Sequence, residues 1–99
     1  MRIQAATLER IVDRIFTAAG CQPAEASCVA RHLVDSNLCG HDSHGVIRVS
    51  RYLDFMKAGK VRPGRQMTVV FESDTVAVVD GNLGFGQVIG EQAMDLLAA

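Results

Sequence analysis

Hydrophobic side chains recur at helical spacing in the N-terminal part of the chain. Residues 8–19 carry them three and four positions apart, with Thr7 in front as a possible N-cap and Gly20 behind as a C-cap. Pro23 suits the first turn of a second helix, which we expect to run to about Asn37. The apolar faces predicted for the two helices are Leu8, Ile11, Val12, Ile15, Phe16 and Ala19 for the first, and Ala26, Val29, Ala30, Leu33 and Val34 for the second.

A third helix is expected after a break in this pattern. Asp42 or Ser43 can cap it, and it ends near Ala58 with Gly59 as the stop. The three helices and a polar link behind them make up a predicted N-terminal helical domain, residues 1–66.

After the polar link the pattern changes to β-type alternation. Two runs of β-branched residues, 67–71 and 75–79, predict a pair of strands joined by a hairpin-like turn. A glycine-rich loop, 81–86, then leads into an amphipathic helix over 87–99 that has no terminator, so we expect the polypeptide to continue. The predicted fold class is α/β, with an α+β arrangement of three helices, a hairpin and a helix in this fragment. Residues 67–99 are interpreted as the start of a cofactor- and substrate-binding α/β domain.

The composition fits one soluble domain. Hydrophobic residues make up 48% of the 99 residues, and 10 basic against 11 acidic residues leave a formal net charge of −1. This balance argues against nucleic acid or an anionic membrane as a partner. No signal peptide is recognisable at the start, and the uncharged segments are shorter than the ~20 apolar residues that cross a bilayer.

The cysteines indicate a reducing compartment. Cys21, Cys28 and Cys39 are an odd number without a CxxC pair, which is typical of reduced, partly buried thiols, and the cytoplasm is the expected location. His32 and His41, with Cys39 and Asp42, could suggest a metal, but Cys39, His41 and His44 lack the paired spacing of structural zinc sites and no fourth ligand is evident, so no metal site is predicted.

Three side chains on the third predicted helix could carry chemistry. His44, Arg48 and Tyr52 stand four positions apart, which would align them on one stripe. An imidazole can pass a proton to a carbonyl oxygen, and a guanidinium one turn away can hold a carboxylate at two points, so the pair fits a 2-oxo acid. Ser43 can cap the helix or hydrogen-bond within the site. The alternative is a solvated helix face that His44 and Arg48 decorate and Ser43 caps.

Glycines before the last predicted helix approximate a dinucleotide-binding fingerprint. Gly84-Phe85-Gly86 is followed by Gly90, but a true fingerprint belongs to a βαβ unit with an acidic residue ~20 positions further on. Here the preceding strand follows a hairpin. We therefore favour a turn that allows close backbone packing over a phosphate cradle, with Asp80 as a turn residue.

Residues 37–48 read Asn-Leu-Cys-Gly-His-Asp-Ser-His-Gly-Val-Ile-Arg, and Tyr52 follows. This segment resembles the signature of the type-2 malate/L-lactate dehydrogenase family, of which Asp-Ser-His-Gly is the most distinctive part. The resemblance extends over nearly the whole chain, through Val-Val-Asp-Gly at 78–81 and Gly-Phe-Gly-Gln at 84–87. Many members have arginine where this chain has Cys39, a difference that leaves the candidate catalytic positions intact.

The resemblance implies an oxidoreductase that moves a hydride between a nicotinamide cofactor, NAD or NADP, and C2 of a 2-oxo or 2-hydroxy acid. It implies that His44 is the acid/base on the substrate oxygen and contacts the cofactor, with Ser43 beside it in a proton relay. It further implies that Arg48 clamps the substrate carboxylate and that Tyr52 lines the pocket.

The resemblance also bears on the whole protein. It implies the family's own non-Rossmann fold and a homodimer with a site built from both subunits. Family members are considerably longer, so the chain is expected to be an N-terminal fragment without most nicotinamide contacts and without the acidic partner of the relay. We expect the fragment alone to be inactive, because an imidazole without an orienting partner has neither its tautomer nor its basicity set.

Two other functions stay open at this point. One is a non-catalytic helical module that binds a protein or an anionic ligand through the Arg48 face. The other is a reductase of a cyclic imine acid on the same scaffold. The sequence does not identify the acid, and it does not distinguish NAD from NADP.

Overall fold

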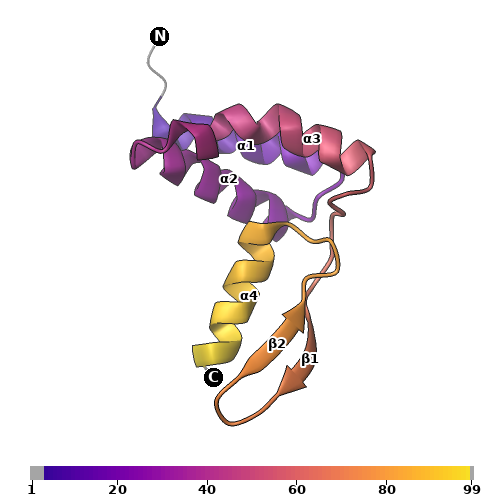
Figure 1. Ribbon diagram of the computed structural model, residues 1–99. Helices are drawn as coiled ribbons and strands as arrows, with labels where there is room; N and C mark the ends of the chain where they lie inside the picture. Colours follow the sequence, from indigo (N-terminus) through magenta and orange to yellow (C-terminus); the bar gives the residue numbers. More distant parts are fainter. Residues whose placement is uncertain (1–3, 99) are drawn as a thin grey trace.

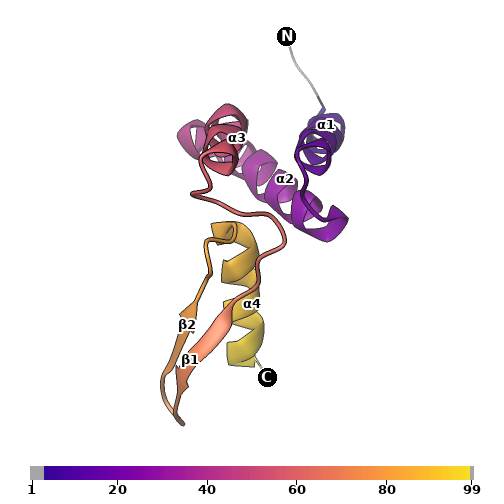
Figure 2. The same ribbon diagram turned by 90° about the vertical axis from the view of Figure 1, so that its right-hand side faces the viewer.

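Three helices, a β-hairpin and a fourth helix follow one another along the chain. The computed structural model describes residues 4–98, with the backbone alone for Asp42. Helices α1–α3 gather at one end of the molecule, and the hairpin and α4 extend away from them (Figures 1 and 2). The predicted order of elements is confirmed. The bounds are α1 (Ala5–Ala18), α2 (Pro23–Leu38), α3 (Val49–Lys57), β1 (Thr68–Glu72), β2 (Ala77–Asp80) and α4 (Gly86–Ala98).

Helix α1 begins earlier than the sequence pattern suggests. Gln4 is its N-cap, so Thr7 lies inside the helix and its predicted capping role is wrong. The two alanines that open the helix are strong helix formers, and they extend it toward the N-terminus. Gly20 follows the helix with a φ of +113°, as predicted for a C-terminal glycine. The face predicted for α1 is buried at Val12 and Phe16 and exposed at Ile11 and Ala19.

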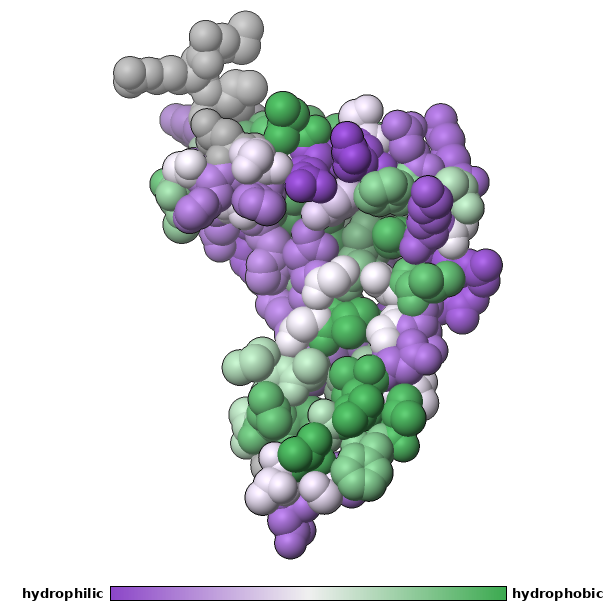
Figure 3. Space-filling view, viewed as in Figure 1, coloured by the Kyte–Doolittle hydropathy of each residue, from purple (hydrophilic) through white to green (hydrophobic). Residues whose placement is uncertain are grey.

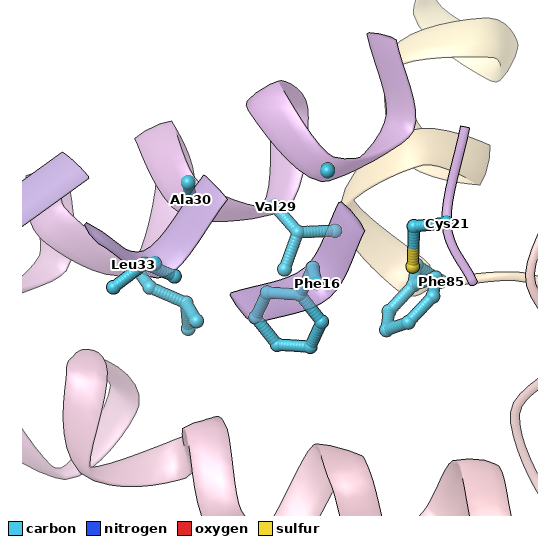
Figure 4. Packing of buried hydrophobic residues seen from close by; sticks show 8 residues of the cluster. Phe16, Cys21, Val29, Ala30, Leu33 and Phe85 are labelled. Carbon is cyan, nitrogen blue, oxygen red and sulfur yellow. The ribbon is translucent and has the colours of Figure 1, made fainter. Parts of the chain in front are cut away.

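The core forms where α1, α2 and the loop before α4 meet. Helix α2 begins with Pro23, and all five residues predicted for its apolar face are buried. Phe16 from α1 and Phe85 from the loop are also buried, and their rings meet edge-on with centroids 5.8 Å apart. Figure 4 shows these rings in one cluster with Cys21 and Val29. Phe85 therefore anchors the start of α4 to the helical part of the molecule.

The third helix differs from its prediction. Two short 3₁₀ turns, η1 (Asp42–His44) and η2 (Val46–Arg48), precede α3, so one continuous helix from Asp42 or Ser43 is wrong. Gly45 separates the turns with extended backbone, φ −96° and ψ −150°, which interrupts helical hydrogen bonding. Helix α3 ends near Ala58, and Gly59 follows with a φ of +74°, as expected for the stop.

The hairpin is antiparallel, with a register irregularity in the middle of β1. Its strands lie within two residues of the predicted runs, 67–71 and 75–79. The predicted turn is also confirmed, since the amide of Ser73 donates to the carbonyl of Val76 at 2.7 Å. The register pairs are Thr68 with Asp80, Val69 with Val79, Phe71 with Val78, and Glu72 with Ala77.

The end of the molecule that holds the hairpin and α4 presents an apolar surface. Figure 3 shows hydrophobic side chains gathered there, in contrast to the more polar surface over the helices. No β1 residue is buried. We refer to this surface as the hairpin face. Its exposed large hydrophobic residues are Val69, Val70, Phe71, Val76, Val78, Leu83, Met94 and Leu97.

Polar contacts hold the link between α3 and β1 against the rest of the chain. The buried carboxylate of Glu25 accepts from the amide of Gly64 with both oxygens, at 3.0 and 2.9 Å. The amide of Arg62 donates to the carbonyl of Leu83 at 2.8 Å. The division of the chain into domains 1–66 and 67–99 stays a prediction.

The structure also describes the cysteines and the lengths of the helices. Cys21, Cys28 and Cys39 are free thiols, the first two buried and the third exposed. Across residues 4–98, no helix has the length and apolar character needed to cross a membrane.

Candidate functional site

The loop between α2 and α3, residues 39–48, carries three of the four candidate residues. Gly40 leaves α2 in the left-handed region, with a φ of +81°, and the amide of His41 donates to the carbonyl of Ser36 at 2.8 Å. The amide of His44 then donates to the carbonyl of His41 at 2.9 Å and closes η1. The segment is thus a tight, hydrogen-bonded turn.

A close contact between Asn37 and Gly45 fixes the path of this loop. The Asn37 side-chain oxygen accepts from the amide of Val46 at 2.9 Å. Gly45 is buried beneath it, and a Cβ at Gly45 would lie 2.3 Å from that oxygen. The glycine of the Asp-Ser-His-Gly segment is therefore required by space and not by a left-handed backbone.

Arg48 folds back over η1. Its Nε donates to the carbonyl oxygen of Ser43 at 2.9 Å, and its backbone amide donates to Gly45 at 3.0 Å. The first bond places the guanidinium beside the peptide that joins Ser43 to His44. The structure therefore brings these three residues together in one turn, by a hydrogen bond that the sequence pattern did not predict.

The side chains of Ser43 and His44 are exposed in this chain. Within residues 4–98 apart from the side chain of Asp42, the imidazole has no hydrogen-bond partner. The predicted helical stripe is wrong, because His44, Arg48 and Tyr52 belong to η1, η2 and α3 in turn. The structure instead places the guanidinium of Arg48, from η2, beside the backbone of η1, where the imidazole of His44 is exposed.

Tyr52 makes its contacts elsewhere. Its half-buried ring packs against Phe16 and Phe85 at centroid distances of 6.3 and 6.2 Å. Its hydroxyl accepts from Nε2 of Gln87 at 3.0 Å. Tyr52 also lines a cleft of about 310 Å³ together with Phe55 and Gln87. These contacts are with α1 and the start of α4, and none of them is to the turn that holds His44.

The glycine loop before α4 is a packed turn. The amide of Asn82 donates to the side chain of Asp80 at 2.8 Å, and the amide of Gly84 donates to the carbonyl of Gly81 at 2.9 Å. A Cβ at Gly84 would meet the end of the Ile89 side chain at 3.0 Å. The preceding strands form an antiparallel hairpin and not a βαβ unit. The geometry fits the interpretation of close backbone packing, with Asp80 as a turn residue.

A further polar cluster joins α2 to α4. The thiol of Cys28 donates to Oε2 of Glu91 at 2.8 Å, and Nε2 of His32 lies 3.6 Å from Oε1. Arg31 forms an ion pair with the same carboxylate. Sequence analysis missed this cluster because Glu91 is remote in the chain, although the spacing of Cys28 and His32, one helical turn apart, was a visible signal.

Both acid groups of this cluster have shifted pKa values. Burial raises the pKa of the Cys28 thiol to about 12, and its hydrogen bond to Glu91 adds to the effect. The hydrogen bond from Cys28 lowers the pKa of Glu91, as do the charges of Arg31 and His32. A protonated thiol beside an ionised carboxylate is therefore the resting state of the cluster at neutral pH.

The model of the malate/L-lactate dehydrogenase family matches residues 3–99. Hydroxycarboxylate dehydrogenase B of Escherichia coli K12 is 35% identical over 95 residues, which is 96% of this chain and 26% of that protein. L-sulfolactate dehydrogenase of Methanocaldococcus jannaschii is 35% identical over 88 residues, 89% of this chain and 26% of that protein. The chain thus spans about a quarter of the length of these relatives.

Solved structures give the same result. A putative malate/lactate dehydrogenase from Escherichia coli superposes with a TM-score of 0.94 at 34% identity, over 97% of this chain and 27% of that one. A Δ1-piperideine-2-carboxylate reductase from Pseudomonas syringae superposes with a TM-score of 0.87 at 26% identity, over 99% of this chain and 30% of that one. The predicted malate/L-lactate dehydrogenase-like fold is confirmed.

Proposed function

Since this chain belongs to the malate/L-lactate dehydrogenase family, we propose that it forms part of an oxidoreductase that interconverts a 2-oxo acid and a 2-hydroxy acid with a nicotinamide cofactor. The observation that carries the proposal is the bond from Arg48 Nε to the Ser43 carbonyl oxygen, 2.9 Å long, which holds the guanidinium against the peptide that precedes His44. A cation and an acid/base on adjacent turns suit a small acid with a carbonyl or hydroxyl next to its carboxylate.

Each residue has one role in this proposal. Arg48 binds the substrate carboxylate through its terminal nitrogens while Nε stays bonded to Ser43. His44 gives a proton to the C2 oxygen during reduction and takes it back during oxidation. Ser43 lies next to His44 in the proton relay. Tyr52 borders the cleft near Phe55 and Gln87 and is proposed as a pocket residue.

We propose that this chain supplies few of the cofactor contacts. When bound, the nicotinamide supplies or accepts the hydride at C2 of the substrate. The imidazole of His44 is exposed, whereas a side chain at Gly84 would meet Ile89. We therefore propose that most cofactor contacts, the choice of NAD or NADP and the acidic partner of the relay come from polypeptide outside residues 1–99. A homodimer and a cytoplasmic location belong to the same proposal.

A second candidate is reduction of a cyclic imine acid. The similarity to a Δ1-piperideine-2-carboxylate reductase favours it, since the same carboxylate clamp and proton donor would serve a C=N bond. The two candidates separate in a substrate panel: the natural full-length protein is assayed with oxaloacetate, pyruvate, 3-sulfopyruvate and a cyclic imine acid, each with NADH and with NADPH. Turnover of the imine alone would replace the first proposal with the second.

The test of the mechanism is His44→Ala in the natural full-length protein. We expect turnover to fall by ~100-fold or more, because general acid/base catalysis contributes about 10²–10⁴-fold. The matched control is His41→Ala, an exposed histidine at the start of the same turn, which we expect to keep near-normal turnover. Near-normal turnover of the His44 variant, with the family reaction established in the parent, would contradict the proposed role.

A further inference from the structure

We propose that Cys28, His32 and Glu91 form a binding site for a transition-metal dication of the zinc class, at the contact of α2 with α4. One ligand atom from each residue, the thiol sulfur, an imidazole nitrogen and a carboxylate oxygen, lies within 4.8 Å of the other two. Sulfur, imidazole nitrogen and carboxylate oxygen are the three donor types that bind Zn²⁺ in proteins. The cluster contains none of the residues assigned to the hydride-transfer site.

The two helices present these donors from fixed positions. Cys28 and His32 lie one turn apart on α2, so their side chains project from the same face. Glu91 is on α4, whose start is anchored by Phe85 in the core. No loop rearrangement is needed to bring the three together, which is the condition for a preorganised site.

His32 supplies an observation independent of the spacing. Its Nε2 atom is shielded from solvent and has no hydrogen-bond partner among the described residues, with the Glu91 carboxylate 3.6 Å away. The contact with Glu91 is too long for a hydrogen bond, and a shielded polar atom that makes no hydrogen bond is costly. A metal ion between the imidazole and the carboxylate would satisfy it.

The charges of the cluster also fit a bound dication. A thiolate and a carboxylate supply two negative charges, and the metal takes the place of the proton that Cys28 now shares with Glu91. Arg31 forms an ion pair with Oε1 of the same carboxylate from the side of the open cleft, and it can orient that carboxylate while Oε2 binds the metal.

On its outer side the cluster borders a shallow cleft of about 590 Å³ lined by His32, Glu91, Gly86 and Gly90. A Cβ built at either glycine would meet no atom within 4 Å, so this side is open. Three protein ligands with one open position describe a zinc site that admits water or an outside ligand, in contrast to closed four-ligand structural sites.

The experiment is a Co²⁺ titration of the natural full-length protein, because Co²⁺ reports a thiolate ligand by a sulfur-to-metal charge-transfer band. We expect the band to appear with one equivalent of Co²⁺ and to disappear when Zn²⁺, but not Mg²⁺, is added. Cys28→Ser should abolish the band. His32→Gln changes a half-exposed side chain, so we expect the variant to fold, and it should weaken binding by at least ~10-fold.

Matched controls are Cys39→Ser and His41→Ala, a thiol and an imidazole exposed on the loop after α2, and both should bind as the parent does. Absence of the band in the folded parent would overturn the proposal. So would a band that survives in both Cys28→Ser and His32→Gln, or one that is lost only in Cys39→Ser. Because turnover is not the readout, this result is independent of the dehydrogenase assignment.

Discussion

Among single residues, Gly45 has the most restrictive surroundings. In Gly45→Ala the new methyl group would lie 2.3 Å from the Asn37 side-chain oxygen, which must then give up its bond to the amide of Val46. We expect a loss of about 1–3 kcal/mol in the free energy of unfolding, from overpacking and an unsatisfied amide, measured by urea denaturation.

The control for this variant is Gly86→Ala, where the added Cβ meets nothing within 4 Å. Its stability should stay within about 0.5 kcal/mol of the parent. Equal stability of the two variants would show that the contact between Asn37 and Gly45 does not restrict the turn.

Cys21 gives the fold a dependence on alkaline pH. Burial raises the pKa of its thiol from 9.0 to about 12, and the nearby carboxylate of Glu25 adds to the shift. Between these pH values the thiol ionises in the unfolded state but stays protonated in the folded state. Its contribution to the free energy of unfolding is therefore complete below pH 9 and is lost as pH rises from about 9 toward 12. We expect the free energy of unfolding to fall less steeply over this range in Cys21→Ala than in the parent.

Urea denaturation at a series of pH values measures that slope. Cys39→Ala, which removes an exposed thiol, should keep the slope of the parent. A Cys21→Ala protein with the parent's slope would exclude Cys21 as its source.

At the scale of elements, Phe85 joins α4 to the helices. It is 2% exposed and packs against the rings of Phe16 and Tyr52. We expect Phe85→Ala to lower the free energy of unfolding by about 3–5 kcal/mol, the usual cost of removing a buried aromatic side chain.

The matched control is Phe71→Ala, because Phe71 is 56% exposed on β1 and should lose far less stability. Chemical denaturation of both variants provides the comparison. Similar losses in the two would mean that the start of α4 is not held by the aromatic cluster.

Helices and strands could be predicted where hydrophobic residues recur at a regular spacing. The five residues predicted for the apolar face of α2 follow an uninterrupted helical repeat behind Pro23 and are all buried, whereas the buried Glu25 and Cys28 were not part of that prediction. The start of α3 was missed, because Gly45 interrupts a pattern that otherwise continues from residue 43. The amide of Val46 finds its partner in the side chain of Asn37, on the preceding helix, and no repeat in the sequence encodes such a contact.

The geometry of the candidate site could not be predicted from the sequence. Ser43, His44 and Arg48 were proposed from their chemistry and from a family resemblance, and their roles stay a prediction, but the bond from Arg48 to the Ser43 carbonyl oxygen replaces the helical stripe that was expected. The contact of Glu91 with α2 depends on how the chain folds back after the hairpin, so only the structure shows it.

At the scale of the whole molecule, the hairpin face dominates the behaviour of the isolated chain. An apolar surface of this kind binds hydrophobic dyes. We expect residues 1–99 to bind anilinonaphthalene sulfonate, and Val70→Lys to lower the fluorescence of the bound dye, because Val70 is 65% exposed on this face.

The control is Ile47→Lys, which removes a hydrophobic side chain that is 73% exposed in η2, on the helical part of the molecule. Its dye fluorescence should match that of the parent. Equal decreases in both variants would show that the dye does not distinguish the two surfaces.

The hydrogen bonds that hold the link before β1 predict where the chain tolerates insertions in evolution. Its amides are held in succession by Leu83, by Glu25 and, at Met67, by the side chain of Gln92. Because these hydrogen bonds hold the link in place, we expect a longer hairpin tip to leave the turn that carries His44 unchanged. Sequence insertions should accumulate at Ser73–Val76 and be rare between Arg62 and Met67.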